Sequence, residues 1–168
     1  MKKRSIEHEI QCAFFEACKS IPGCEYMHAI PNAVPVRTGG LSKDAARLAR
    51  IIAQKHMTRE GRKSGVLDVF NPKPITLIRK TERTEFTRSW NGLYIEFKRP
   101  ASVVNGKKSV AGQLKSEQAE FILYADRNGY AVEVCFSVQE GVNTVLRYLR
   151  GEHSNSAAVA LANRKLKL

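Results

Sequence analysis

A short stretch near the middle of the chain constrains the fold most, because apolar and charged side chains alternate along it. Leu93, Ile95 and Phe97 alternate with Glu96 and Lys98. In a β-strand, alternate residues share a face, so the three apolar side chains are expected to point toward a core. The carboxylate of Glu96 and the ammonium group of Lys98 are then expected to lie side by side on the opposite face. The stretch predicts a strand with one apolar and one charged face.

The composition favours a single domain with a polyanionic partner. The chain has 168 residues, 43% of them hydrophobic, which is enough to bury a core. Its net charge is +12, from 28 basic and 16 acidic residues. Because the basic residues cluster, DNA or RNA is favoured over an acidic membrane or a role in solubility alone. No apolar stretch approaches the roughly 20 residues that span a bilayer, and no signal peptide is expected, so we expect a cytoplasmic protein with no membrane partner.

Several common functional motifs are missing from the sequence. There is no Walker loop, no GxSxG and no CxxC pair, which argues against nucleotide-driven motors, serine hydrolases and zinc fingers. Cys12 and Cys18 fall near the apolar side of the first predicted helix, and buried free thiols are expected. The four histidines have no ligand spacing, and we expect no site role for them.

Hydrophobic periodicity predicts strands flanked by helices. Helices are expected over 5–19, 42–56, 116–128 and 137–149. Strands are expected over 66–70, 75–78, 130–136 and through Glu96. A short extended piece is expected over 26–30, a long, polar hairpin excursion over 79–91 and a loop over 101–113. This order implies an α/β sandwich around a mixed β-sheet. Residues 1–150 are expected to form the domain, and 151–168 a weakly patterned tail that is either flexible or a dimer arm.

Asp68 is a second acid within an apolar strand. Taken alone, Asp68 is explained by a solvent-facing position, and Glu96 with Lys98 by a surface charge pair. On neighbouring strands of a strongly basic chain, the three together are better explained by a site for a hard divalent cation with a water beside it. Such a site suits phosphodiester hydrolysis, because a bound metal acidifies water and polarises the phosphoryl oxygen.

Two helices supply further candidates. Gln118 shares an apolar stripe with Phe121 and Ile122, so its amide is either a buried structural group bonded to backbone or a group that reaches a phosphate or the water near the metal. Glu7 borders the apolar stripe of the first helix, as does Glu9 on its other edge. A solvated carboxylate in the first turn explains Glu7 about as well as a site role does.

The segment 41–63 carries seven basic residues against two acidic ones. Lys43, Arg47 and Arg50 are spaced three or four apart, so they share one helical face. Contact with phosphates is favoured over a merely solvated face because of the charge imbalance. The candidate nucleic-acid contacts are Lys43, Arg47, Arg50, Arg62, Lys63, Arg99 and Lys115.

These residues resemble the VRR-NUC family of the PD-(D/E)xK nuclease superfamily over about residues 5–150. The stretches that carry the resemblance are EHEIQ at 7–11, AIPN at 29–32, KSGVLDV at 63–69, GLYIEFKR at 92–99, SEQ at 116–118 and GYAVEV at 129–134. Two departures stand out. Leu67 occupies a position where the family often has proline, and an insertion at 79–91 lengthens the separation between Asp68 and Glu96.

The resemblance implies a restriction-endonuclease-like core and a DNA endonuclease dependent on Mg²⁺ or Mn²⁺. It implies that the metal is held by Asp68, Glu96 and the main-chain carbonyl of Phe97, with support from Glu7. It also implies that Lys98 orients or deprotonates the attacking water and that Gln118 helps to position that water or the scissile phosphate. By the same resemblance we expect a homodimer acting on branched DNA such as four-way (Holliday) junctions, in replication or repair in a bacterial cell or phage-infected host. The alternatives are a non-catalytic nucleic-acid-binding module and an RNA-processing nuclease.

Overall fold

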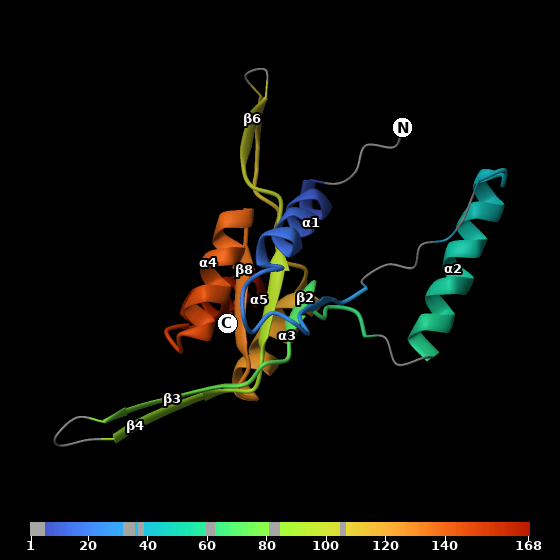
Figure 1. Cartoon of the computed structure of the whole chain (residues 1–168). Helices are drawn as coiled ribbons and strands as arrows, with labels where there is room; N and C mark the ends of the chain where they lie inside the picture. The colour runs from blue at the N-terminus through green and yellow to red at the C-terminus, as the bar shows by residue number, and fades with distance from the viewer. Residues whose placement is uncertain (1–5, 32–35, 37–38, 60–62, 81–84, 105–106) are drawn as a thin grey trace.

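The computed structural model describes residues 6–31, 36, 39–59, 63–80, 85–104 and 107–168 (Figure 1). Its helices are α1 (Ile6–Cys18), α2 (Lys43–Arg59), α3 (Ser116–Arg127), α4 (Val138–Leu149) and α5 (Ser156–Leu166). Its strands are β1 (His28–Ala29), β2 (Val69–Asn71), β3 (Ile75–Lys80), β4 (Glu85–Trp90), β5 (Leu93–Phe97), β6 (Ser102–Val104), β7 (Lys107–Ser109) and β8 (Ala131–Cys135). Each helix in the described part of the chain is too short or too polar to cross a membrane.

The central sheet is mixed. Its strand order is β1-β2-β5-β8, with β2 antiparallel and β8 parallel to β5. α1 and α4 pack on one face of this sheet, and α3 and α5 pack on the other (Figure 1). The predicted fold class, an α/β arrangement of a mixed sheet flanked by helices, is therefore confirmed.

Alternation along β5 sorts its side chains between these two faces. Ile95 and Phe97 are buried on the side of α1, where the ring of Phe97 lies 5.0 Å from that of Phe14, centroid to centroid. The opposite face is buried by apolar residues such as Ile122 of α3 and Ala158 of α5. The charged side chains at the end of β5 point into this second face, so they need polar partners beneath α3.

Two hairpins extend from the sheet (Figure 1). β3 pairs with β4 from Ile75–Trp90 to Lys80–Glu85, and β6 pairs with β7. The hairpin excursion predicted over 79–91 is therefore confirmed, and β3 and β4 are its two strands. The loop predicted over 101–113 is wrong in part, because β6 and β7 pair within it although a segment rich in Gly, Lys and Ser has little strand propensity.

The segment expected to be a flexible tail contains α5. Ala158 and Ala162, one turn apart, are fully buried against the face that α3 covers. Asn155, just before α5, accepts a hydrogen bond from the Val132 N–H at 2.9 Å and donates one to the Tyr130 carbonyl at 2.9 Å. The flexible alternative is therefore wrong, because small apolar residues at helical spacing gave weak contrast in the sequence but bury well against a neighbouring helix.

Two smaller expectations are also corrected. The strand predicted over 66–70 begins at Val69. All four cysteines are free as expected, but Cys12 is exposed.

Candidate active site

The pairing of β2 with β5 brings two carboxylates together. Val69 lies opposite Ile95 in an antiparallel register, so Asp68, which directly precedes β2, comes opposite Glu96. The main-chain N–H of Phe97 donates to Asp68 Oδ2 at 3.0 Å, and this bond holds the Asp68 carboxylate against the end of β5. The structure thus places these two acids as neighbours, as the sequence predicts.

Glu96, Lys98 and Gln118 form a closed hydrogen-bonded triangle. Lys98 Nζ donates to Glu96 Oε1 at 2.6 Å and to Gln118 Oε1 at 3.0 Å, and Gln118 Nε2 donates to Glu96 Oε1 at 2.5 Å. The three residues are 2%, 7% and 7% exposed, respectively. Breaking a buried, hydrogen-bonded ion pair by removing one partner typically costs about 3–5 kcal/mol, so each member fixes the position of the others.

Gln118 also belongs to the cap of α3. Its Oε1 accepts a hydrogen bond from the Lys115 main-chain N–H at 3.0 Å, which satisfies one of the free N–H groups at the start of the helix. The buried amide bonds to backbone, as the first alternative predicts, and also to the charged pair. Its contact with a phosphate or with a water near a metal stays a prediction. The first turn of α3 and the end of β5 are tied together through this one side chain.

One oxygen of the triangle lacks a partner. Glu96 Oε2 is buried and makes no hydrogen bond, although an unsatisfied buried carboxylate oxygen is costly. Burial and the adjacent Asp68 carboxylate raise the pKa of Glu96 to about 7, against the opposing effect of Lys98. A divalent cation between the two carboxylates would give Glu96 Oε2 a partner and would offset the repulsion between the two negative charges. The pair therefore fits a bound metal ion.

α1 contributes a third carboxylate to the same region. Glu7 Oε1 accepts a hydrogen bond from the Arg99 main-chain N–H at 3.2 Å, and Gln11 Nε2 donates to the Asp68 carbonyl at 3.3 Å. Glu7 and Gln11 lie one turn apart, so a single face of α1 is aligned with both β2 and the end of β5. Among the described residues, no three His, Cys, Asp or Glu side chains are grouped to hold a metal ion. The neighbouring carboxylates are therefore the pair Asp68 and Glu96, and Mg²⁺ commonly takes only one or two carboxylates and keeps several waters.

An open cavity of about 760 Å³ unites these groups. Beyond the candidates already described, it is lined by residues to which the sequence gave no site role, among them His8, Gln54, Ser64, Gln113 and Glu117. They come from α1, α2, α3 and the loops between strands, and no spacing in the sequence relates them. This cavity is the candidate catalytic pocket.

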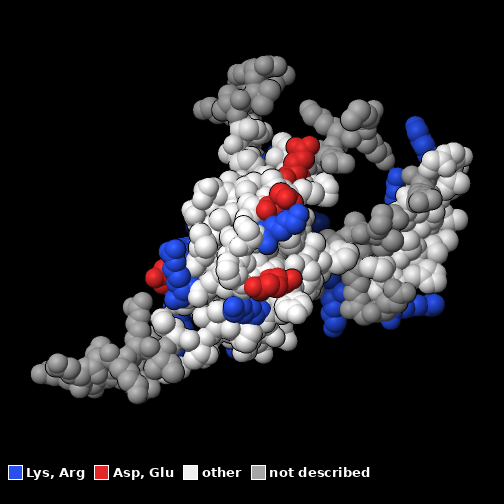
Figure 2. All heavy atoms as spheres, in the orientation of Figure 1, with Lys and Arg blue, Asp and Glu red and all other residues white. Residues whose placement is uncertain are grey.

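The basic candidates are distributed around this pocket in different ways. Lys115 lines it, and Arg99 is exposed beside it with its Nη2 donating to the Val110 carbonyl at 2.9 Å. Lys63 is also exposed, whereas Arg62 lies outside the described residues. Lys43, Arg47 and Arg50 are exposed on α2. Figure 2 shows blue and no red spheres on the visible face of α2, which stands apart from the body of the molecule (Figure 1).

Comparison with known proteins supports the fold. No protein-family model matches the sequence, and no curated protein matches it. A solved structure described as a VRR_NUC domain protein superposes with a TM-score of 0.55 and 18% sequence identity, over 88% of this chain and 91% of the other. At this identity the likeness concerns the fold alone. The chain therefore has the fold of a VRR_NUC domain protein.

Proposed function

We propose that the protein is a metal-dependent nuclease that hydrolyses phosphodiester bonds in DNA. The observation that carries the proposal is the unpartnered Glu96 Oε2, buried opposite Asp68 in the pocket that also holds the Lys98 ammonium group. Two converging carboxylates beside a lysine suit a divalent cation and an attacking water. The fold shared with a VRR_NUC domain protein agrees with this chemistry.

Asp68, Glu96 and the Phe97 carbonyl would hold Mg²⁺ or Mn²⁺, with Glu7 in support. The ion, when bound, would lower the pKa of a water and polarise a phosphoryl oxygen. The protein contributes by fixing the carboxylates. Asp68 is held by the Phe97 N–H, and Glu96 is held by Lys98 and Gln118.

Lys98 is the residue expected to act on the reacting groups. An ammonium group has three N–H donors, and two of them are directed at Glu96 and Gln118. The third is available to orient the attacking water or to stabilise the negative charge that develops on the phosphate. Gln118 keeps Lys98 in place. From the first turn of α3 it would lie within reach of the same water or of the scissile phosphate.

The exposed cations would position the nucleic acid without reading its sequence. Lys115 and Arg99 lie at the pocket, and α2 would add Lys43, Arg47 and Arg50 as a second set of phosphate contacts, with Arg62 and Lys63 following them along the chain. Homodimerisation and a preference for branched DNA such as four-way junctions are part of the proposal. The exposed stripe of Leu48, Ile51 and Ile52 on α2 supports an association through that helix, because such patches commonly mark interaction sites.

The first test measures cleavage of four-way junctions, flaps and linear duplexes with Mg²⁺, with Mn²⁺ and with EDTA. We expect metal-dependent cleavage by the wild type, none by Asp68→Asn, and unchanged cleavage by Glu120→Gln, an exposed residue of α3 that serves as the control. A second readout is thermal unfolding: either metal should raise the Tm of the wild type but not that of Asp68→Asn, because only a protein that binds the ion is stabilised by it.

Two outcomes would redirect the proposal. DNA binding without cleavage under any metal would indicate a non-catalytic nucleic-acid-binding module. Cleavage confined to RNA substrates in the same assay would indicate an RNA-processing nuclease. Light scattering gives the oligomeric state, and a strictly monomeric protein at all concentrations would contradict the dimer.

A further inference from the structure

We propose that a second pocket, beside the catalytic one, binds the base of an unpaired nucleotide next to the scissile phosphate. This inference rests on the proposed nuclease function. The second pocket has a volume of about 390 Å³ and lies between the loop 110–114, β8 and α5. Nothing in the sequence indicated it, because α5 was not expected to pack on the domain.

The two pockets are continuous. Lys98 and Gln113 line both of them. The loop lies directly against the lysine, since a Cβ atom added to Gly112 would be 3.4 Å from Lys98 Cβ. A nucleic-acid strand whose phosphate meets Lys98 therefore has its next nucleotide at the entrance of the second pocket.

The lining of the second pocket matches a nucleotide. Its walls include the ring of Phe136 and the side chains of Leu114 and Leu161. Arg164 and Lys165, in the last turn of α5, are exposed at its rim, and none of its described lining residues is acidic. An apolar and aromatic pocket accepts the face of a base, while the cations accept the phosphates on either side of it.

An unpaired base fits this site, whereas a paired one does not. Within a duplex both faces of a base are covered by its neighbours, so entry into the pocket requires unstacking. That cost is a few kcal/mol for a paired base and is least for a base that is already single-stranded. The pocket thereby gives a physical reason for a preference for branched DNA that carries a single-stranded flap or arm over a four-way junction, whose bases are all paired.

The test measures binding in EDTA, so that it does not depend on cleavage. The probe is a labelled duplex with a single-stranded arm in which one abasic position is moved along the arm. For the wild type, one position should weaken binding by roughly fivefold or more, the range of base–aromatic stacking. Phe136→Leu should weaken binding to the intact arm and abolish the sensitivity to that abasic position. Ala111→Trp, which fills the pocket from its loop, should abolish that sensitivity as well.

The rim has its own variant and control. The double variant Arg164→Ala with Lys165→Ala should weaken binding to all arms similarly. It should also reduce the slope of log K against log salt concentration by about 2, which corresponds to two lost phosphate contacts. Arg127→Ala with Arg150→Ala removes two exposed arginines outside both pockets and should leave binding unchanged.

Two results would overturn the inference. The first is that no abasic position weakens binding to the wild type. The second is that Phe136→Leu and Ala111→Trp each weaken binding to the intact arm and to the abasic arm by the same factor. Either result can occur while metal-dependent cleavage persists, in which case the nuclease function stands and the base pocket does not. Conversely, the protein could cleave no DNA with any metal and still bind more weakly to one abasic position. That result would contradict the nuclease function and would leave a binding site for unpaired DNA.

Discussion

Glu96 on β5 and Glu133 on β8 are alike in sequence but differ in their surroundings. Each is a lone carboxylate within an apolar strand, and the two strands are adjacent and parallel. Burial raises the pKa of both above the ordinary value for glutamate. The register pairs Glu133 with Ile95, so Glu133 faces the side of α1 and α4, whereas Glu96 faces α3.

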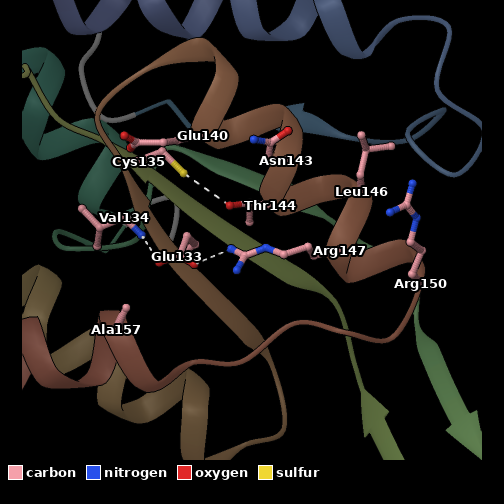
Figure 3. A pocket seen from close by; sticks show the side chains of 10 residues that line it. All are labelled: Glu133, Val134, Cys135, Glu140, Asn143, Thr144, Leu146, Arg147, Arg150 and Ala157. Carbon is pink, nitrogen blue, oxygen red and sulfur yellow. Dashed lines mark hydrogen bonds and ion pairs between the residues drawn. The ribbon is translucent and has the colours of Figure 1, made fainter.

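Glu133 is satisfied by its neighbours. Its Oε2 accepts a hydrogen bond from Arg147 Nη2 at 3.2 Å, and its Oε1 accepts one from the Val134 N–H at 3.3 Å (Figure 3). The Arg147 side chain is 50% exposed and faces an open cavity of about 570 Å³ between β8, α4 and α5 (Figure 3).

Other groups in that cavity are also engaged. Glu140 Oε2 accepts a hydrogen bond from the Phe136 N–H, and the Cys135 thiol bonds to the Thr144 hydroxyl. Burial raises the pKa of Cys135 to about 12, so the thiol stays protonated at neutral pH and is a poor nucleophile. What distinguishes the site carboxylate Glu96 from Glu133 is therefore an unpartnered oxygen and an acid opposite it, and not burial itself.

The largest expected difference between the two carboxylates is in cleavage. Removing a residue that only supports a metal ligand typically lowers metal affinity or activity by about 10- to 100-fold. Removing a ligand itself should cost more, so Glu96→Gln should lower the rate of metal-dependent cleavage by at least about 100-fold. Glu133→Gln should leave the rate within about twofold of wild type, because its oxygens are already used. Equal losses in both variants would remove the distinction. Single-turnover cleavage of one DNA substrate measures it.

The cationic partners should differ in the same direction. Lys98→Met keeps the length of the side chain but removes the charge that we propose stabilises the transition state, and a loss of about 100-fold in single-turnover rate is expected. Arg147→Met should cleave normally. If Lys98→Met and Arg147→Met lower the cleavage rate to the same degree, Arg147 takes part in the chemistry. The proposed difference between the Glu96 and Glu133 sites would then be wrong.

The next largest expected difference between Glu96 and Glu133 is in the pH dependence of stability, measured in metal-free protein. The pKa of Glu96 is raised from 4.5 to about 7, so between these values the native state binds more protons than the unfolded state. The free energy of unfolding should therefore fall as pH rises from 4.5 to 7, by at most about 1.4 kcal/mol per pH unit, and change little outside this window on account of Glu96.

Urea unfolding in EDTA across pH 4 to 8 provides the measurement. Glu96→Gln should flatten the decline, and Glu133→Gln should flatten it less, since Arg147 and the Val134 N–H offset the burial of Glu133. An unchanged slope in Glu96→Gln would show that Glu96 is already ionised in the folded protein.

The smallest expected effect concerns the ion pair of Glu133. Arg147→Ala should change the free energy of unfolding by no more than about 1 kcal/mol, because an ion pair with a half-exposed partner is screened by solvent. Thermal unfolding at neutral pH, in low and high salt, gives this value. A loss several times larger would mean that the β8 carboxylate supports the fold more than its exposure indicates.

The sequence predicted which residues meet at the pocket better than it predicted the surroundings of the pocket. The alternation around Glu96 and the position of Asp68 specified one face of two neighbouring strands, and strand pairing did the rest. Glu133 interrupts its strand in the same way, so local pattern could not separate the two acids. That separation depends on Asp68 and Gln118, which lie far from Glu96 along the chain and meet it only in the folded protein.

The surroundings were missed for different reasons. α5 shows little contrast between polar and apolar residues, because alanines do most of its packing. The short hairpin of β6 and β7 lies in a segment rich in Gly, Lys and Ser, which have little strand propensity. The second pocket combines residues from α5, β8 and the loop 110–114, and nothing in their order along the chain relates them.

The ribbon of β3 and β4 has one further consequence. It leaves the sheet after Asn71 and returns at Leu93, and these two residues face each other across β2 and β5. Its ends are therefore clamped together whatever its length, so shortening it by matched residue pairs should preserve the spacing of the two acids. The protein thus has a built-in position where segments of other lengths can be exchanged while the distance between Asp68 and Glu96 stays constant.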